Sequence, residues 1–140
     1  MQIDTLKKTV VIGTIGSDCH IVGATILAYA LREAGFNVHH IGAICSQEEF
    51  VNAAKETAAD AVWVSSLYGM GLLDCVGLKE SLVEAGLGHV TLYVGGLLTA
   101  TELAWEETER RFKDMGVDRV YPSATKPDKP IADLKKDLGI

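Results

Sequence analysis

The sequence has few aromatic residues, few prolines and no surplus of basic charge. Aromatic residues make up 6% of its 140 residues, so a buried core must be mostly aliphatic. Lysine and arginine together number 13 against 19 aspartates and glutamates, which gives a net charge of −6. Nucleic acids and anionic membrane surfaces attract the opposite balance of charge. We therefore expect neither nucleic acid nor a membrane as a partner.

Cysteines and long apolar runs are scarce as well. The three cysteines, Cys19, Cys45 and Cys75, form no C-x-x-C motif, and no run approaches the ~18 apolar residues of a membrane span. The segment 1–8 lacks the apolar stretch of a signal peptide. These absences predict a cytoplasmic protein with reduced thiols. A chain of this length is expected to form one domain, residues 1–140, and is too short for a (β/α)₈ barrel of ~250 residues.

What the sequence does contain is an alternation of short apolar runs with amphipathic segments. Continuous apolar runs predict strands that are buried on both faces of a sheet, at 9–15, 36–41, 61–64, 90–94 and 119–121. Helices are predicted between them at 22–34, after Ser46, at 72–85, 101–115 and 131–138. Ser46 and Glu49 have the spacing of a capping box. Five βα units predict an α/β fold with a doubly wound parallel sheet in the flavodoxin-like order 2-1-3-4-5, a Rossmann-like three-layer sandwich.

Ligands of such sheets bind at the carboxyl ends of the strands, which makes the first loop, 16–23, a candidate site. This loop contains neither G-x-x-x-x-G-K-[ST] nor G-x-G-x-x-G, so it is not a typical nucleotide loop. It does place Asp18 two residues before His20. A metal-ligating histidine usually gives its second ring N–H to a carboxylate, yet one histidine and one aspartate cannot complete a zinc site. A metal here would have to bring most of its ligands, as in a macrocycle; alternatively, Asp18 caps the first helix and His20 is an ordinary loop residue.

Three loops together resemble the cobalamin-binding domain family. Its D-x-H-x-x-G pattern matches Asp18–Gly23, its S-x-L matches Ser65–Leu67, and its G-G matches Gly95–Gly96. The segments GSDCH, VSSLYG and RFKDMGVDRVYP further resemble the small subunits of glutamate mutase (methylaspartate mutase), over essentially the whole chain. Corrinoid proteins of methyltransferases have a helical segment before this domain, and the short segment before the first strand favours the mutase subunit. Leu97 departs from the family, which often has asparagine there.

The resemblance implies that the chain binds adenosylcobalamin, with His20 as the lower axial ligand of cobalt and Asp18 on the other ring nitrogen. The detached base of the cofactor is expected between the sheet and the first helix, where Gly13, Gly16, Gly23 and Ala24 are small. No residue of this chain is expected to be catalytic. The implied cofactor contacts are Ser17, Asp18, Cys19, His20, Ile21, Gly23, Ser65, Ser66, Leu67, Tyr68, Gly95, Gly96, Leu97, Leu98 and Thr99, and the implied metal ligand is His20.

The implied activity is that of an isomerase, the radical rearrangement of L-glutamate to threo-3-methylaspartate after homolysis of the cobalt–carbon bond. A dicarboxylate substrate needs arginines, and the four arginines are all expected away from the carboxyl ends of the strands: Arg32, Arg110, Arg111 and Arg119. The family's larger, barrel-shaped subunit would therefore hold glutamate, in an assembly of two small and two large subunits, and the small subunit alone would be inactive. Candidate contacts with it are Cys19, Tyr68, Met70 and Leu98.

Two alternative functions stay open. In the first, the chain is a corrinoid carrier or sensor that works with a methyltransferase or a regulatory partner. In the second, it is a flavodoxin-like domain that binds no corrin. Several conspicuous side chains are expected to be structural: His39 and His40 at a strand end, and Trp63, Trp105, Cys45 and Cys75 in the core.

Overall fold

A parallel five-stranded sheet forms the centre of the structure, a computed structural model that describes residues 7–16, 20–66, 70–96 and 104–140. The strands follow the order β2-β1-β3-β4-β5, and each pairs in parallel with its neighbours. This order confirms the predicted doubly wound topology. The strands are β1 (Thr9–Ile15), β2 (Asn37–Cys45), β3 (Ala61–Ser65), β4 (Thr91–Gly96) and β5 (Arg119–Pro122).

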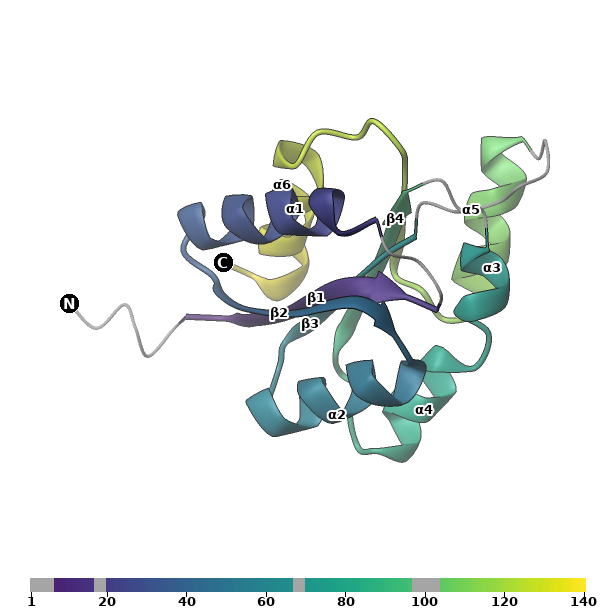
Figure 1. Cartoon of the computed structure of the whole chain (residues 1–140), viewed down its shortest axis with the longest axis horizontal. Coiled ribbons are helices and arrows are strands. Elements are labelled where there is room, and N and C mark those ends of the chain that lie inside the picture. Colours follow the sequence, from purple (N-terminus) through teal and green to yellow (C-terminus); the bar gives the residue numbers. More distant parts are fainter. Residues whose placement is uncertain (1–6, 17–19, 67–69, 97–103) are drawn as a thin grey trace.

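Helices cover both faces of the sheet (Figure 1). On one face α1 and α6 pack over a core that includes Ile12, Trp63 and Leu134. On the other face α2, α4 and α5 pack over a core centred on Phe50 and Phe112. The helices are α1 (Ile21–Glu33), α2 (Gln47–Thr57), α3 (Gly71–Asp74), α4 (Leu78–Glu84), α5 (Trp105–Asp114) and α6 (Asp128–Leu138). In the described part of the chain no helix is long and apolar enough to cross a membrane.

Strand β2 is longer than predicted because it continues past residue 41 through an irregular stretch. Its register with β1 shifts twice, between Ile12 and Gly13 and between Gly13 and Ile15. Gly42 and Ile44 both have a positive φ there, of 99° and 57°, and Ile44 N donates a 3.0 Å hydrogen bond to Thr14 Oγ1. A β-branched residue rarely adopts such a φ. The bulge therefore carries local strain that apolar periodicity does not reveal.

The single helix predicted over 72–85 is wrong, because the chain breaks into α3 and α4. Gly77, between them, has a φ of 85°, a backbone conformation that favours glycine. The Gln47 side chain, at the start of α2, donates from Nε2 to the carbonyls of Asp74 and Val76, at 2.7 Å each. One side-chain amide thus donates to two backbone carbonyls at the break between the two helices.

The start of α2 confirms the predicted capping box. Ser46 Oγ accepts from Glu49 N, and Ser46 N donates to Glu49 Oε1, both at 3.1 Å. The last helix begins at Asp128 rather than at 131, and Pro130 lies in its first turn. A proline is tolerated there because the backbone N–H groups of the first turn have no helical acceptor.

Candidate functional site

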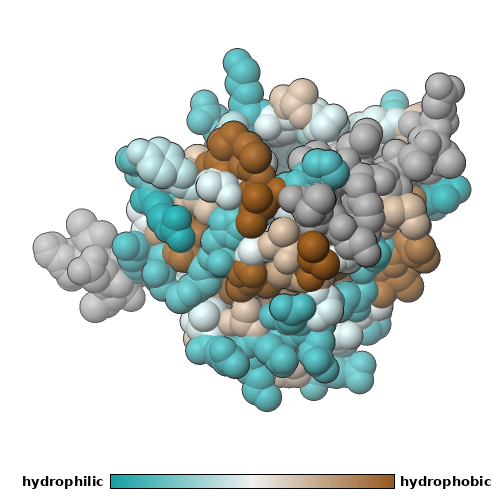
Figure 2. Space-filling view, in the orientation of Figure 1, coloured by the Kyte–Doolittle hydropathy of each residue, from teal (hydrophilic) through white to brown (hydrophobic). Residues whose placement is uncertain are grey.

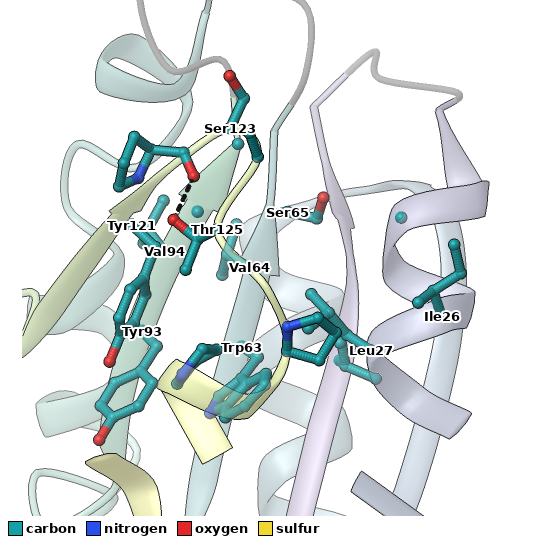
Figure 3. A pocket seen from close by; sticks show the side chains of 18 residues that line it. Ile26, Leu27, Trp63, Val64, Ser65, Tyr93, Val94, Tyr121, Ser123 and Thr125 are labelled. Atoms are coloured by element: carbon teal, nitrogen blue, oxygen red, sulfur yellow. Dashed lines mark hydrogen bonds between the residues drawn. The ribbon is translucent and has the colours of Figure 1, made fainter. Parts of the chain in front are cut away.

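A cavity of about 310 Å³ lies between α1 and the segment that leads into α6, at the carboxyl ends of the strands (Figure 3). Its floor is the sheet, one wall is α1 with Gly23, Ile26 and Leu27, and the opposite wall runs from Tyr121 to Pro130. Ligand pockets begin at roughly this volume. The cavity therefore has the size and place expected of a ligand site in an open α/β sheet.

The floor of the cavity consists of two rows of side chains that the strand register places next to each other. The inner row aligns Ile12, Trp63 and Tyr93 across β1, β3 and β4. The outer row, two residues further along β3 and β4, aligns Ser65 with Gly95. Because side chains of one face recur every second residue, both rows face the same side of the sheet. The bulky inner row closes the cavity and the small outer row leaves it open.

Gly95 leaves open space in the outer row, although the backbone at this position does not require a glycine. A Cβ at this position would lie 3.5 Å from both the Cβ and the carbonyl oxygen of Tyr121, an ordinary van der Waals contact. The fold could therefore accept a methyl group here. What a methyl group would remove is space above the sheet, beside Ser65.

Aromatic rings line the inner end and one side of the cavity. Trp63 and Tyr93 stack with their ring centroids 5.6 Å apart and their planes 19° apart, and Tyr93 meets Tyr121 at 5.7 Å with a tilt of 57°. Figure 3 shows the Trp63 and Tyr93 rings together at the inner end of the cavity. Such a wall suits a flat apolar or heteroaromatic group.

The two tyrosines also anchor α6 to the sheet. Tyr93 donates its hydroxyl to Asp137 at 2.5 Å, and Tyr121 donates to Asp133 at 2.6 Å. Arg119 adds a bidentate pair with Asp137, with both N···O distances at 2.8 Å. The hydrogen bonds from Arg119 lower the pKa of Asp137 to about 2, whereas burial and the bond to Asp137 raise the pKa of Tyr93. Both phenols therefore stay protonated and donate their hydrogen bonds to carboxylates of α6 rather than to a ligand.

Two buried polar atoms, one in β3 and one directly after it, have no hydrogen-bond partner among the described residues. They are the indole nitrogen Nε1 of Trp63 and the hydroxyl Oγ of Ser66. A buried donor or acceptor without a partner costs about 1–3 kcal/mol. Native proteins rarely keep such groups without a reason, so Trp63 Nε1, whose residue lines the cavity, is a candidate to meet a ligand.

Comparison with known proteins identifies the family. The B12 binding domain family matches residues 8–128. The chain is 56% identical over 134 residues to the glutamate mutase sigma subunit of Clostridium tetani, covering 96% of this chain and 98% of the relative. The chain belongs to the glutamate mutase sigma subunit family. The sigma subunit of Fusobacterium nucleatum is 52% identical with the same coverage.

Solved structures with this fold include a cobalamin-binding protein from Desulfitobacterium hafniense, at a TM-score of 0.76 and 20% identity, covering 94% of this chain and 59% of that one. The receiver domain of NarL from Mycobacterium tuberculosis also aligns, at a TM-score of 0.67 and 16% identity, over 96% of this chain and 98% of that domain. At such identities the likeness shows the fold alone. The sequence relatives, not the fold, separate this sigma subunit from receiver domains.

Of the residues predicted to contact the cofactor in this sigma subunit, Gly23, Ser65, Gly95 and Gly96 line the cavity. His20 is exposed directly before α1, and Ile21 is the first residue of that helix. Ser66 is fully buried beside the lining. Eight other predicted residues lie outside the described part of the chain: Ser17, Asp18, Cys19, Leu67, Tyr68, Leu97, Leu98 and Thr99.

Gly13 was expected beside the detached base, but the structure gives it another neighbour. A Cβ on Gly13 would lie 2.8 Å from Ile41 Cγ1 and 3.0 Å from the Gly42 carbonyl. Because glycine has no side chain, Ile41 and Gly42 of β2 can lie close to this position. In the described segments of the sigma subunit, no three His, Cys, Asp or Glu side chains group as a metal site.

The sequence interpretation missed the aromatic wall of the sigma subunit cavity. It placed Trp63 in the core, which agrees with its 4% exposure, and it did not single out Tyr93 or Tyr121. Strand parity was the available signal, because Trp63 lies two residues before Ser65 and Tyr93 two before Gly95. Each pair must share a face of the sheet.

His40, predicted to be a solvated or strand-end residue, is held in place by two neighbours. Gly42 N donates to His40 Nδ1 at 3.0 Å, and Thr25 Oγ1 lies 3.2 Å from Nε2. An acceptor role at Nδ1 places the hydrogen of the neutral ring on Nε2, where it can reach Thr25. Burial, and after it the charge of Arg32, lowers the pKa of His40. This ring links β2 to α1, the helix that forms one wall of the cavity.

Proposed function

We propose that this chain carries adenosylcobalamin for a glutamate mutase, with the detached base of the cofactor in the cavity between α1 and α6. The observation that carries the proposal is the shape of that cavity. It is open over Ser65 and Gly95, closed by aromatic rings, and bounded by the helix that His20 precedes. A flat base on a flexible linker matches a slot that is narrow, apolar and closed at one end.

The residues present fit this group in three respects. The volume of about 310 Å³ is sufficient for a heteroaromatic base. Gly23 in the wall and Gly95 in the floor leave room in the cavity because neither adds a side chain. The buried Nε1 of Trp63, which lines the cavity, has no acceptor among the described residues, so a ligand with polar atoms would meet it.

His20 is assigned as the lower axial ligand of cobalt through one ring nitrogen. It lies exposed directly before α1, the helix that forms one wall of the cavity, where a ligand that brings its own macrocycle would reach it. Asp18 is assigned to the other ring nitrogen, where a carboxylate fixes the tautomer and makes the histidine a stronger ligand. When bound, adenosylcobalamin supplies the radical chemistry, and the protein positions it.

Glutamate is assigned to a partner catalytic subunit. A dicarboxylate needs arginine, yet Arg32, Arg110 and Arg111 lie on helices and Arg119 pairs with Asp137 at the start of β5. We assign a barrel shape to this partner and an assembly of two small and two large subunits. We place the assembly in the cytoplasm, a reducing compartment that agrees with the free thiols of Cys45 and Cys75.

The surface around the cavity offers apolar contacts for such a partner. Figure 2 shows hydrophobic side chains gathered over α1, and Val22, Ile26 and Tyr29 are more than half exposed there. Met70, one of the four candidate contacts, is 39% exposed. Large exposed apolar residues that gather in one place are typical of interaction surfaces.

The test combines binding and activity. The purified chain should bind adenosylcobalamin in equilibrium dialysis, with the absorption spectrum of a cobalamin whose base has left cobalt, and should form methylaspartate only with the large subunit. His20→Gly should lose turnover or bind far more weakly, whereas His89→Gly, at an exposed turn, should not. Absence of cobalamin binding by the unmodified chain would overturn the proposal. Binding without turnover beside the large subunit would favour a corrinoid carrier instead.

A further inference from the structure

The side chain of His40 joins two elements that meet at one edge of the sheet. His40 lies on β2, the outermost strand on that side, and α1 packs against this strand (Figure 1). The ring is half-buried between them. Gly42 N donates to Nδ1 at 3.0 Å, and Thr25 Oγ1 of α1 lies 3.2 Å from Nε2. One imidazole therefore adds a polar link between α1 and β2 to their apolar packing.

This arrangement suits the neutral ring of His40 and not the charged one. Because Gly42 N donates, Nδ1 must present a lone pair, and the single ring hydrogen lies on Nε2, where Thr25 can accept it. An imidazolium carries a hydrogen on both nitrogens. In that form Nδ1–H would face the N–H of Gly42, so the ring must turn away. The same rotation takes Nε2 away from Thr25.

The surroundings of the ring on α1 also disfavour the charged form. Arg32, two turns after Thr25 on that helix, donates to the Val38 carbonyl of β2 at 3.4 Å. Burial lowers the pKa of His40, and the positive charge of Arg32 lowers it further. The link is therefore formed at neutral pH and is lost in acid.

Other titratable groups lie near His40 and must be separated from it. His39, the next residue on β2, faces the opposite side of the sheet, where its Nε2 lies 3.4 Å from Asn37 Nδ2. Ile12, which is paired with His40 on β1, carries no charge. His20 lies directly before α1, and a charge on it would act on the same helix. A test must therefore compare chains that all keep His20.

We propose that His40 is a positioning residue, which fastens α1 to β2 while its ring is neutral and releases the helix when the ring is protonated. The packing of α1 then depends on pH in the range below about 6.5, the ordinary pKa of histidine. The inference concerns the chain without a ligand, so it holds or fails independently of the proposed function.

Amide hydrogen exchange of the unliganded chain at pH 7.5 and pH 4.5 tests the release of α1. Exchange rates are expressed as protection factors, which removes the intrinsic effect of pH, and α2 serves as the internal reference. Between the two pH values, the protection of α1 relative to α2 should fall about 2- to 5-fold more in the unmodified chain than in His40→Asn. This is the lower part of the range for one hydrogen bond, because Thr25 is exposed.

The variants separate the titration of His40 from its other contacts. In His40→Asn the side-chain oxygen can still accept from the backbone two residues further on, but it does not titrate. His39→Asn is the matched control, since His39 is exposed on the other face of β2, and it should keep the full response to pH. Thr25→Val removes the hydroxyl on α1 and should lower the protection of α1 about 2- to 5-fold already at pH 7.5.

The ring itself gives a readout that a purely structural contact would not change. At pH 7.5 the ¹⁵N spectrum of His40 should show a hydrogen on Nε2 and none on Nδ1. As the pH falls, the amide resonance of Gly42 should shift with the same midpoint as the His40 ring, because Nδ1 stops accepting from it.

A consequence for the cofactor rests on the proposed function. Because α1 forms one wall of the cavity, the affinity of the unmodified chain for adenosylcobalamin, divided by that of His40→Asn, should be about 2- to 5-fold lower at pH 4.5 than at pH 7.5. Protonation of His20 or of the cofactor affects both chains and cancels in this ratio.

The outcomes separate the two levels of inference. An equal response of α1 to pH in the unmodified chain and in His40→Asn, a loss of the response in His39→Asn, or a hydrogen on Nδ1 of His40 at pH 7.5 would each overturn the role of His40. Failure of the unmodified chain to bind cobalamin would instead overturn the proposed function, and the exchange results would stand.

Discussion

Replacing Asp137 by asparagine should weaken the attachment of α6 to the sheet. The carboxylate of Asp137 accepts from the Tyr93 hydroxyl and forms the bidentate pair with Arg119. Asparagine keeps the shape of the side chain but has no charge for the guanidinium. Because α6 begins at the wall of the cavity, its attachment determines how firmly that wall is held.

The size of the effect follows from the pKa of the carboxyl group. Hydrogen bonds from Arg119, and after them the Tyr93 hydroxyl, lower that pKa from 3.8 to about 2. Each pKa unit corresponds to 1.36 kcal/mol, so these neighbours together favour the charged form by at most about 2.4 kcal/mol. The side chain is 26% exposed, and solvent screening reduces the contribution to about 1–2 kcal/mol. The folded pKa is depressed, so this stability is present above pH ~4 and is lost as the pH falls towards 2.

Urea unfolding, followed by tryptophan fluorescence at pH 7 and at pH 3, measures this contribution. Asp137→Asn should unfold with about 1–2 kcal/mol less free energy at pH 7, and the difference from the unmodified chain should shrink at pH 3. Asp114→Asn is the control, since Asp114 is 65% exposed and its pair with Arg110 should be worth less than about 1 kcal/mol. The reasoning fails if both variants behave alike, or if the difference does not shrink in acid.

Three further predictions concern the floor of the cavity and its neighbours. Gly95→Ala should leave the free energy of unfolding unchanged or up to about 1 kcal/mol higher, because the methyl group makes only an ordinary contact with Tyr121. Its affinity for cobalamin should fall about tenfold, since the methyl group occupies space in the cavity. An unchanged affinity in equilibrium dialysis would contradict the placement of the base. Gly13→Ala should do the reverse, costing about 1–3 kcal/mol in urea unfolding because its Cβ would press on Ile41 at 2.8 Å, with little effect on affinity. His40 has a lowered pKa, so the stability it adds is full above pH ~6.5 and declines as the pH falls below that value; an NMR titration that gives His40 a pKa above 6.5 would refute this.

The sheet order could be predicted because it depends on local patterns. Apolar β-branched runs such as Thr9–Ile15 are typical of buried strands. Right-handed crossovers then leave a small number of possible strand orders for five βα units. The capping box of Ser46 and Glu49 was predictable for the same reason, since its two hydrogen bonds join residues three apart.

Features that depend on distant neighbours could not be predicted. Gly77 has the positive φ that ends a helix, but the carbonyls of Asp74 and Val76 beside it accept from Gln47, 27 and 29 residues earlier. Strand parity could have placed Trp63 and Tyr93 on the face of Ser65 and Gly95, but their contact depends on the register between β3 and β4. The family motifs pointed to the outer row at Ser65 and Gly95, and the inner row carries no motif.

The bridge from Gln47 to the break before α4 has a consequence for divergence within the family. Its two hydrogen bonds join the start of α2 to the carbonyls of Asp74 and Val76, which lie just before Gly77, where the chain breaks into two helices. A relative that lost the glycine and formed one continuous helix would move both carbonyls away from residue 47, and one that lost the amide would lose both hydrogen bonds between the break and α2. The two positions should therefore change together over evolutionary time, although neither side chain belongs to the cavity.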